Sequence, residues 1–357
     1  MKIAFVDLGR HFGGIEVYML SLLAERKKQG KKDVILARKD SAFFQKLTEA
    51  GYGKETLAVG FDLGSIREAR RRLKEEKVEM IHTNGINSGM FASLLGLKVK
   101  CVATVHGDAA FDRIEKNILI QRGFVWLENR LLKKCNQVIA VSEAIKEILI
   151  GRGIPSEKIK VIHNGIEKMD YTAAEGPDGQ EKNLFRICFV GRLEKVKGCE
   201  YLIKALAELK DQAYLCDIYG EGSLKEELKL LCKEVGIEEK VVFKGFSGEI
   251  RKVLNLYDVL VQPSLFEAFP LTPLEAMNAG VLVIGSNVGG MKELIQDGET
   301  GLKFEAGQAH ELAEKIRRVI ENEAEAAAIK ENAYRLFEEE YTKEIMCEKT
   351  FKLLESI

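Results

Sequence analysis

The feature that most constrains the fold is a regular alternation of short apolar segments with amphipathic ones, which runs twice along the 357 residues. In the first half the apolar segments begin with 2–8, and most are followed by a segment with helical spacing. The rhythm restarts at 186–190 and continues to 281–284. Strands that alternate with helices form a parallel sheet covered on both faces. We therefore predict an α/β protein with two such sheets in series.

A polar, glycine-containing stretch separates the two halves and is typical of an interdomain linker. The pattern predicts a Rossmann-like domain over 1–167, a linker over 168–183 and a second Rossmann-like domain over 184–340. The tail is helical in character, and its last helix, 341–357, is predicted to return to the first domain. The length suits two domains, because domains usually contain about 100–200 residues.

The composition indicates a chain that folds in a reducing compartment. Its seven Cys are scattered without a CxxC pair, as expected of free thiols and not of a disulfide framework or a zinc site. We see neither a secretory leader nor an apolar run of membrane-spanning length, and we expect a cytoplasmic protein. Residues 1–167 carry a net charge of +9 and the remainder −10. The basic half either meets anionic partners or simply has solvated helix faces.

The first motif that indicates a binding function is the loop 191–198, between the first predicted strand and the first predicted helix of the second domain. Amide N–H groups at a helix amino terminus attract anions. Arg192 adds a planar fork suited to a phosphate, and Lys197 adds a mobile ammonium group. The sequence thus favours a phosphate site here, and the alternative is a surface loop with two solvated bases.

A second motif places two carboxylates, Glu267 and Glu275, at the entry to a helix expected over 273–279. A carboxylate can accept two hydrogen bonds from the cis-diol of a ribose. Glu275 has a structural alternative, because the stretch 272–275 is also a capping box with Thr272 as its N-cap. Glu267 stands in a loop among apolar neighbours and has no such alternative.

Together these motifs resemble the family 4 glycosyltransferases of the GT-B fold. Arg192 and Lys197 match the family's basic pair, and Glu267 and Glu275 match its E-x7-E signature. The resemblance covers nearly the whole chain, through similar stretches at 13–16, 103–108, 140–143, 161–166, 219–222 and 287–290. It implies two Rossmann-like domains with a cleft between them, and a retaining transferase that uses a nucleotide sugar.

The resemblance also implies roles for single residues. Arg192 and Lys197 would bind the donor diphosphate and stabilise the charge that develops as the sugar departs. Glu275 would hold the ribose, and Glu267 the sugar hydroxyls. The implied catalytic residues are His106, Glu267, Arg192 and Lys197. The implied donor-binding residues are Gly14, Arg192, Lys197, Gly220, Gly222, Phe246, Glu267, Phe269, Leu271 and Glu275.

Acceptor contacts are predicted from position alone. His82 and Asn84 end a strand at the same predicted sheet edge as His106, and His11 lies beside the first glycine loop. For a histidine at a strand end the alternative is a core residue. The acceptor is expected to be a saccharide or a lipid-linked compound, and polyprenyl-linked saccharides of surface-polysaccharide assembly are favoured by analogy with the family.

Two absences from the sequence narrow the chemistry. Asp-x-Asp does not occur, so we expect no metal ion and no other cofactor, with fixed cations in place of a metal clamp. The dinucleotide pattern GxGxxG does not occur either, which disfavours a nicotinamide enzyme. A uridine donor is preferred, with guanosine next. The rival functions are a nucleotide-sugar 2-epimerase and a catalytically silent subunit that binds nucleotide sugars.

Two basic segments raise the question of membrane contact. The expected helix over 65–77 is rich in Arg and Lys, and the one over 114–134 combines Trp126 with basic and aliphatic residues. Such helices suit peripheral binding to anionic lipid on the inner face of the cell membrane. The alternative for 114–134 is that its apolar face packs on the sheet. We expect no nucleic-acid partner.

Overall fold

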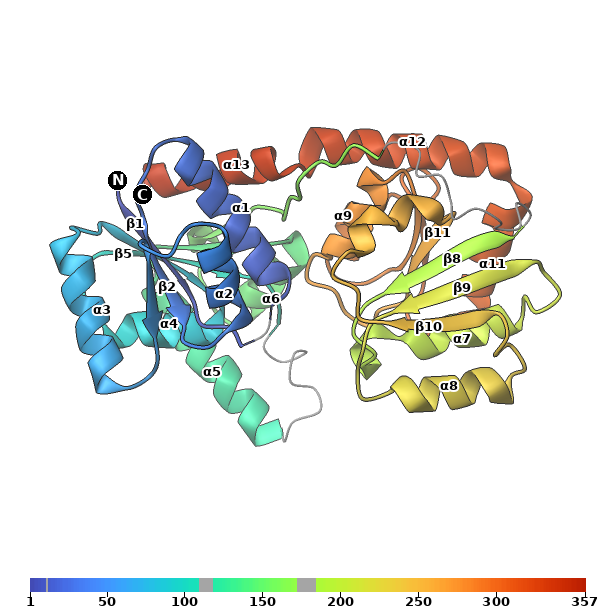
Figure 1. Cartoon of the computed structure of the whole chain (residues 1–357), viewed down its shortest axis with the longest axis horizontal. Coiled ribbons are helices and arrows are strands. Elements are labelled where there is room, and N and C mark those ends of the chain that lie inside the picture. The colour runs from blue at the N-terminus through green and yellow to red at the C-terminus, as the bar shows by residue number, and fades with distance from the viewer. Residues whose placement is uncertain (11, 109–117, 172–183) are drawn as a thin grey trace. The chain divides into compact units, whose positions relative to one another are not determined.

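The computed structural model describes residues 1–10, 12–108, 118–171 and 184–357. The described chain divides into two compact units, one formed by 1–167 with 343–357 and the other by 168–342. Each unit contains one parallel sheet with helices packed against it (Figure 1). The prediction of two parallel α/β sheets in series is therefore confirmed.

The first sheet has seven parallel strands in the order β3-β2-β1-β4-β5-β6-β7. The strands are β1 (Ile3–Asp7), β2 (Val34–Arg38), β3 (Thr56–Val59), β4 (Met80–Asn84), β5 (Lys100–Val105), β6 (Gln137–Ala140) and β7 (Ile159–Val161). The helices are α1 (Gly14–Lys28), α2 (Ala42–Glu49), α3 (Leu63–Glu75), α4 (Gly85–Leu94), α5 (Ile118–Lys134), α6 (Glu143–Gly151) and α13 (Lys343–Ser356). The strand order reverses between β1 and β4, and parallel sheets bind ligands outside the carboxyl ends of the strands at such a point.

The first unit holds apolar side chains on both faces of its sheet. Phe5 of β1 packs in a core with Tyr18 of α1 and Phe351 of α13. The opposite core joins Val6 of β1 to Phe91 of α4. Neighbouring side chains on one strand thus enter different cores, as the pleat of a strand requires, because successive side chains point to opposite faces.

The second sheet has six parallel strands in the order β10-β9-β8-β11-β12-β13. Its strands are β8 (Phe185–Val190), β9 (Tyr214–Tyr219), β10 (Val241–Gly245), β11 (Val259–Gln262), β12 (Leu282–Ser286) and β13 (Leu302–Phe304). The helices are α7 (Cys199–Ala207), α8 (Lys225–Glu234), α9 (Leu271–Asn278), α10 (Met291–Leu294), α11 (Ala309–Glu321) and α12 (Glu323–Glu340). Here the order reverses between β8 and β11, so the two predicted donor motifs follow the two strands at the switch point.

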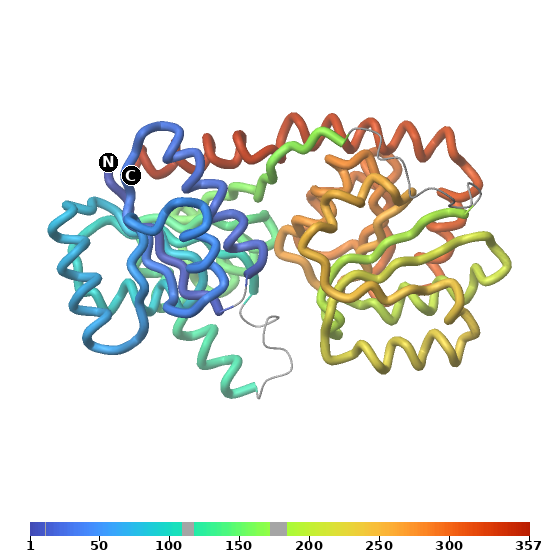
Figure 2. The backbone as a smooth tube through the Cα atoms, in the orientation of Figure 1, coloured from blue at the N-terminus to red at the C-terminus, as the bar shows by residue number. Residues whose placement is uncertain are grey.

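The last helix belongs to the first unit although the residues before it belong to the second. The backbone N–H of Lys343 donates to the carbonyl of Ile166 at 2.8 Å, where α13 begins. Cys347 and Leu354 of α13 then lie in the same core as Ile3. The first strand and the last helix of the chain therefore share one core, and Figures 1 and 2, which have the same orientation, draw both chain ends at this unit.

Candidate functional site

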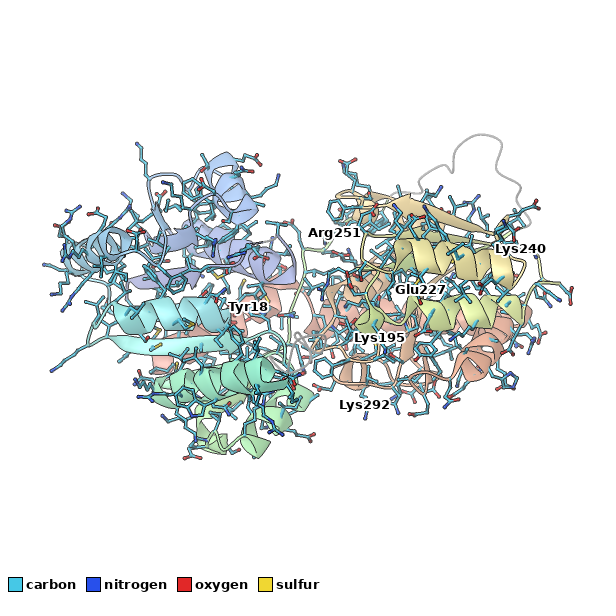
Figure 3. All side chains as sticks on the ribbon, turned by 90° about the horizontal axis from the view of Figure 1, so that it is seen from below. Tyr18, Lys195, Glu227, Lys240, Arg251 and Lys292 are labelled. Atoms are coloured by element: carbon cyan, nitrogen blue, oxygen red, sulfur yellow. The ribbon has the colours of Figure 1, made fainter. Side chains whose placement is uncertain are left out.

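The loop after β8 carries the two predicted phosphate-binding bases. Arg192 is exposed at its start, and Lys197 ends a short 3-10 turn directly before α7. Figure 3 labels Lys195 on the same turn. The Glu194 carboxylate fixes the loop, since it accepts hydrogen bonds from the Ser223 amide at 2.9 Å and from the Ser223 hydroxyl at 2.6 Å. These bonds lower the pKa of Glu194. The loop therefore presents both cations near a helix amino terminus.

Two glycines let the loop after β9 approach the loop after β8. A Cβ on Gly220, whose φ is +139°, would lie 1.8 Å from the carbonyl oxygen of Gly191. A Cβ on Gly222 would lie 2.3 Å from the carbonyl oxygen of Leu193. Side chains do not fit at either position, and the backbones pack directly. The predicted donor residues Gly220 and Gly222 thus lie against the loop that carries the bases.

Glu267 is the centre of a buried polar cluster at the carboxyl end of β11. Its Oε1 accepts hydrogen bonds from the Lys197 ammonium at 2.6 Å, the Ser264 hydroxyl at 2.7 Å and the Gln262 amide at 3.1 Å. All three bonds end on Oε1, so Oε2 takes part in none of them. The Ser286 hydroxyl, at the end of β12, donates to the carbonyl of Ser264 and holds this turn. The structure therefore brings the predicted residues Lys197 and Glu267 together.

Glu275 lies on α9 and faces Arg251, whose Nε is 3.4 Å from its Oε1. Burial raises the pKa of Glu275 to about 7, while Arg251 opposes the rise. The capping-box alternative for Glu275 is wrong, because α9 begins at Leu271 with Pro270 as its N-cap. Glu275 therefore lies in the second turn of the helix, too far along it to cap the first amides.

The remaining predicted donor residues of the second unit lie after β10, after β11 and at the start of α9. Leu271 begins α9, and first-turn amides lack a partner inside their own helix. Phe269 is buried, and its ring centroid lies 5.5 Å from that of Tyr341. Phe246 is 81% exposed and follows Gly245, whose carbonyl accepts the Gly220 amide at 2.9 Å. An aromatic face next to Gly220 is suited to stacking on a base.

In the first unit, His106 follows β5 and is oriented by Asn84. The Asn84 amide nitrogen donates to the Met19 sulfur at 2.8 Å, which turns the amide oxygen toward His106. That oxygen lies 2.9 Å from His106 Nε2, so Nε2 is the donor. Burial lowers the pKa of His106 to about 3, so the ring is neutral at pH 7 and its Nδ1 is an acceptor.

The other first-unit candidates differ in exposure. His82 is fully buried and its Nε2 lies 2.7 Å from the Thr104 hydroxyl, while burial lowers its pKa to about 3. His82 is therefore a core residue, and its prediction as an acceptor contact is wrong for this structure. Gly14 is the first residue of α1. His11 lies outside the described residues.

Several residues of the site were missed by the sequence reasoning. Ser264, Gln262 and Ser286 hold Glu267 or its turn, and Arg251 holds Glu275. The polar turn at 262–264 was the available signal for the first two. Arg251 and Ser286 precede or follow the motif by many residues, and local sequence does not connect them to it.

In the part of the chain that the structure describes, no three His, Cys, Asp or Glu side chains meet in a way that could hold a metal ion. None of the helices in that part has both the length and the apolarity that a bilayer span needs.

Comparison with known proteins covers both units. The family model for glycosyltransferase family 4 matches residues 12–168, and the model for glycosyl transferases group 1 matches residues 173–336. An uncharacterized glycosyltransferase of Methanocaldococcus jannaschii is 35% identical over 58% of this chain and 56% of its own length. The UDP-Gal:alpha-D-GlcNAc-diphosphoundecaprenol alpha-1,3-galactosyltransferase of Escherichia coli is 29% identical over 73% of this chain and 71% of its own.

Solved structures show the same architecture. Anabaena Alr3699/HepE, crystallised in complex with UDP-glucose, superposes with a TM-score of 0.86 at 24% identity and covers 100% of both chains. The sucrose-phosphate synthase of Thermosynechococcus elongatus gives 0.83 at 20% identity, over 99% of this chain and 98% of its own. The two parallel sheets, the two family models and these relatives agree, and the chain belongs to the family 4 glycosyltransferases of the GT-B fold.

Proposed function

We propose that this glycosyltransferase moves a hexose or N-acetylhexosamine from a nucleoside-diphosphate sugar, preferably a UDP-sugar, to a hydroxyl of a saccharide or lipid-linked acceptor. The observation that carries the proposal is the Lys197–Glu267 pair, 2.6 Å apart, at the switch point of the second sheet. The relative from Escherichia coli is named for a UDP-galactose donor, and HepE was crystallised with UDP-glucose. Both support uridine over guanosine.

The cluster can bind an anion without losing its own structure. An ammonium group has three N–H donors, so Lys197 can keep its bond to Glu267 and still donate to a diphosphate oxygen. Arg192 lies exposed on the same loop and adds a second, planar donor. We assign the diphosphate to Arg192 and Lys197, the ribose to Glu275, and the sugar hydroxyls to Glu267 with the amides of Phe269 and Leu271.

The proposed reaction retains the anomeric configuration. The bond between the anomeric carbon and the acceptor oxygen forms on the face from which the diphosphate departs, and the bond to the diphosphate breaks. The acceptor proton passes to the departing phosphate oxygen. Arg192 and Lys197 stabilise the negative charge that develops there, so the proposal requires no metal ion. Glu267 acts as a hydrogen-bond partner, and we expect no covalent glycosyl-enzyme.

The first unit is proposed to serve the acceptor. The resemblance assigns His106 to the transferred sugar and Gly14 to the diphosphate, and these assignments remain predictions.

Peripheral contact with the inner face of the cell membrane is proposed for α5, where Ile118, Leu119 and Trp126 are exposed beside Arg122 and Arg130. Flotation with anionic but not with neutral liposomes is the expected result, and equal recovery with both would remove the membrane part of the proposal.

The first test measures donor binding to Lys197→Ala. Calorimetry with UDP-, GDP- and ADP-glucose in the presence of chelator should give one clear binder for the wild type. Loss of a charge-assisted contact to phosphate should weaken its affinity about 10- to 100-fold in the variant. Lys195→Ala is the matched control, because Lys195 is an exposed lysine of the same turn and should leave the affinity unchanged.

The other outcomes separate the rival functions. If no nucleotide sugar binds with or without added metal, the donor assignment fails. Tight binding without transfer to any acceptor favours the silent subunit. Conversion of a free nucleotide sugar to its 2-epimer in the absence of acceptor would favour the epimerase.

A further inference from the structure

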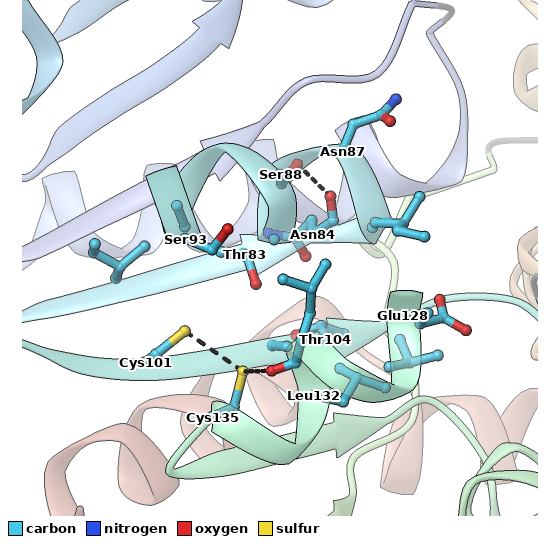
Figure 4. Close-up of a pocket in the computed structure, with 18 of the residues that line it drawn as sticks. Thr83, Asn84, Asn87, Ser88, Ser93, Cys101, Thr104, Glu128, Leu132 and Cys135 are labelled. Atoms are coloured by element: carbon cyan, nitrogen blue, oxygen red, sulfur yellow. Dashed lines mark hydrogen bonds between the residues drawn. The ribbon is translucent and has the colours of Figure 1, made fainter. Parts of the chain in front are cut away.

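A cavity of about 380 Å³ lies inside the first unit, between helices α4 and α5 and strands β4 and β5 (Figure 4). Its volume is in the range of small-molecule sites. One end reaches the carboxyl edge of the sheet at Asp7, Asn84 and His106. The other end reaches Cys101 and Cys135, which Figure 4 shows far from Glu128. The cavity therefore runs along the face of the sheet.

Helix α5 covers this part of the sheet without filling the space beneath it. Of its 17 residues only Glu128 and Leu132 are buried. A helix that belongs to a parallel α/β fold normally buries a whole apolar stripe against the sheet. Empty space next to apolar side chains forfeits contacts and is costly to stability. A cavity at this position is therefore better explained by a ligand than by packing.

The lining changes in character from one end to the other. Asp7, Asn84 and His106 give the edge of the sheet a polar end, and Glu128 adds a carboxylate that Arg152 holds at 3.0 Å. Toward the far end the lining includes Leu97, Val99, Leu131 and Leu132. The far end also contains Ser93 and Lys134, but its other lining side chains are aliphatic groups and thiols, which matches a molecule with a polar head and an apolar tail.

The charges of the lining side chains decide which kind of polar head group the cavity can hold. Among the described residues that line the cavity, the only Lys or Arg is Lys134, and it lies at the end away from His106. The polar end instead offers carboxyl groups and a neutral imidazole with an acceptor nitrogen, all of which suit hydroxyl groups. A phosphate placed there would face Asp7 and Glu128, and no cation stands beside them among the described lining residues.

We propose that this cavity binds a single hydrocarbon chain of the acceptor, whose neutral, hydroxyl-bearing head lies at the polar end beside His106. The inference rests on the proposed transferase function and names its acceptor class as a glycolipid or a similar hydroxylated lipid. It disfavours a polyprenyl diphosphate in this cavity, because none of the described residues that line its polar half is a Lys or Arg that could face the linking phosphates. Burial also raises the pKa of Asp7 to about 7, which reduces the anionic character of that end.

The test uses detergents as acceptor mimics, below their critical micelle concentrations. Dodecyl maltoside should bind the wild-type protein, maltose alone should not, and dodecyl phosphate should bind at least tenfold more weakly than dodecyl maltoside. Along the series octyl, decyl and dodecyl maltoside, each methylene should tighten binding up to about fourfold until the cavity is full. Affinity independent of chain length would overturn the proposal, and preference for dodecyl phosphate would overturn the neutral head.

Amino-acid substitutions test whether the hydrocarbon chain of the detergent lies in the cavity. Ala92→Phe, on the cavity side of α4, should weaken dodecyl maltoside binding at least tenfold. Leu94→Phe is the matched control, since Leu94 is exposed on the same helix and should bind as the wild type does. Independently of any packing variant, dodecyl maltoside should slow the alkylation of Cys101, which is not fully buried and lines the far end. Cys101→Ser gives the background from the six other thiols.

Calorimetry with UDP-glucose on the wild type keeps the two proposals apart. If UDP-glucose binds but the detergents do not bind, or bind Ala92→Phe as tightly as the wild type, the cavity proposal alone is wrong. If the detergents bind as expected and UDP-glucose does not, the donor assignment is wrong and the cavity remains a lipid site.

Discussion

Glu275 is a carboxyl group in surroundings that disfavour its charge. Its side chain is largely buried on α9, and Arg251 offsets only part of the cost of burial. The pKa of Glu275 is near 7 in the folded protein, compared with 4.5 for an ordinary glutamate. A residue that costs stability at neutral pH is more readily explained by a role in binding than by a role in folding.

This cost predicts a pH-dependent effect of Glu275→Gln. The folded state binds the proton more tightly than the unfolded state, so the wild type loses stability as pH rises from about 4.5 to 7. The variant should be more stable than the wild type at pH 8, by at most about 3 kcal/mol, and no more stable at pH 4.5. Melting temperatures of the wild type and the variant at pH 4.5 and pH 8 measure the difference in stability. Glu331→Gln, an exposed control on α12, should change the melting temperature by a small amount that is equal at the two pH values.

Lys197 and Glu267 form an ion pair, so the effect of changing one of them depends on the other. The Lys197 ammonium and the Glu267 carboxylate are each partly or wholly withdrawn from water, and each neutralises the other. Removal of Lys197 therefore leaves Glu267 with its hydroxyl and amide donors but without the ammonium group. For this reason the loss of donor affinity in Lys197→Ala should be compared with that in Glu267→Gln and in the double variant.

At the scale of elements, the site is built from loops that follow strands and pack backbone against backbone. The loop after β9 lies on the loop after β8, where the Leu193 amide donates to the carbonyl of Glu221 at 2.9 Å. The Leu265 amide likewise donates to the carbonyl of Val196 at 2.8 Å, which links the loop after β11 to the loop after β8. Because these contacts leave no room for side chains, the precision of the site depends on glycines.

The closeness of the loops can be tested with Gly220→Ala. The added Cβ would collide with the carbonyl of Gly191, so the two loops must separate. We expect a loss of about 2–4 kcal/mol in stability and at least tenfold weaker donor binding. Gly236→Ala is the control, because its φ is +73° but nothing lies within 4 Å of the new Cβ. It should cost only the conformational strain, about 1 kcal/mol, and leave binding unchanged.

At the scale of the whole molecule, the chain completes its first unit with its last helix. Phe351 of α13 lies in the core of that unit, and the Arg26 guanidinium lies 5.7 Å from the centre of its ring. The first unit therefore remains incomplete until synthesis has passed through the second. Contacts between the beginning and the end of a chain are slow to form, because the loop between them must close first.

Phe351→Ala should accordingly destabilise the first unit and leave the second one intact. Removal of a buried aromatic ring costs about 3–5 kcal/mol. Hydrogen exchange should become faster in peptides from β1 and α1, while peptides from β8 and β9 keep their protection. Lys352→Ala, at an exposed position of the same helix, should leave both sets unchanged. Equal loss of protection in both units would show that they unfold together.

The strands that the sequence did not predict share a position in the fold. β3, β7 and β13 are three of the four edge strands of the two sheets and have only three or four residues, whereas the fourth, β10, has five. An edge strand pairs on one side only and stays partly exposed, so it lacks the continuous apolar run that marks a central strand. The central strands β1 and β8 bury both faces and were predicted from their apolar runs.

The sequence by itself determined the parallel α/β class, the duplicated sheet and the two motifs that carry charge. These depend on local patterns: period, apolar runs, and bases or acids beside glycines and helix starts. The tertiary structure decided the rest. Lys197 and Glu267 are 70 residues apart, Glu275 meets Arg251, α9 starts at Leu271, His82 is in the core, and a cavity lies under α5. Each depends on how elements pack, because burial and the meeting of distant side chains are properties of the folded chain.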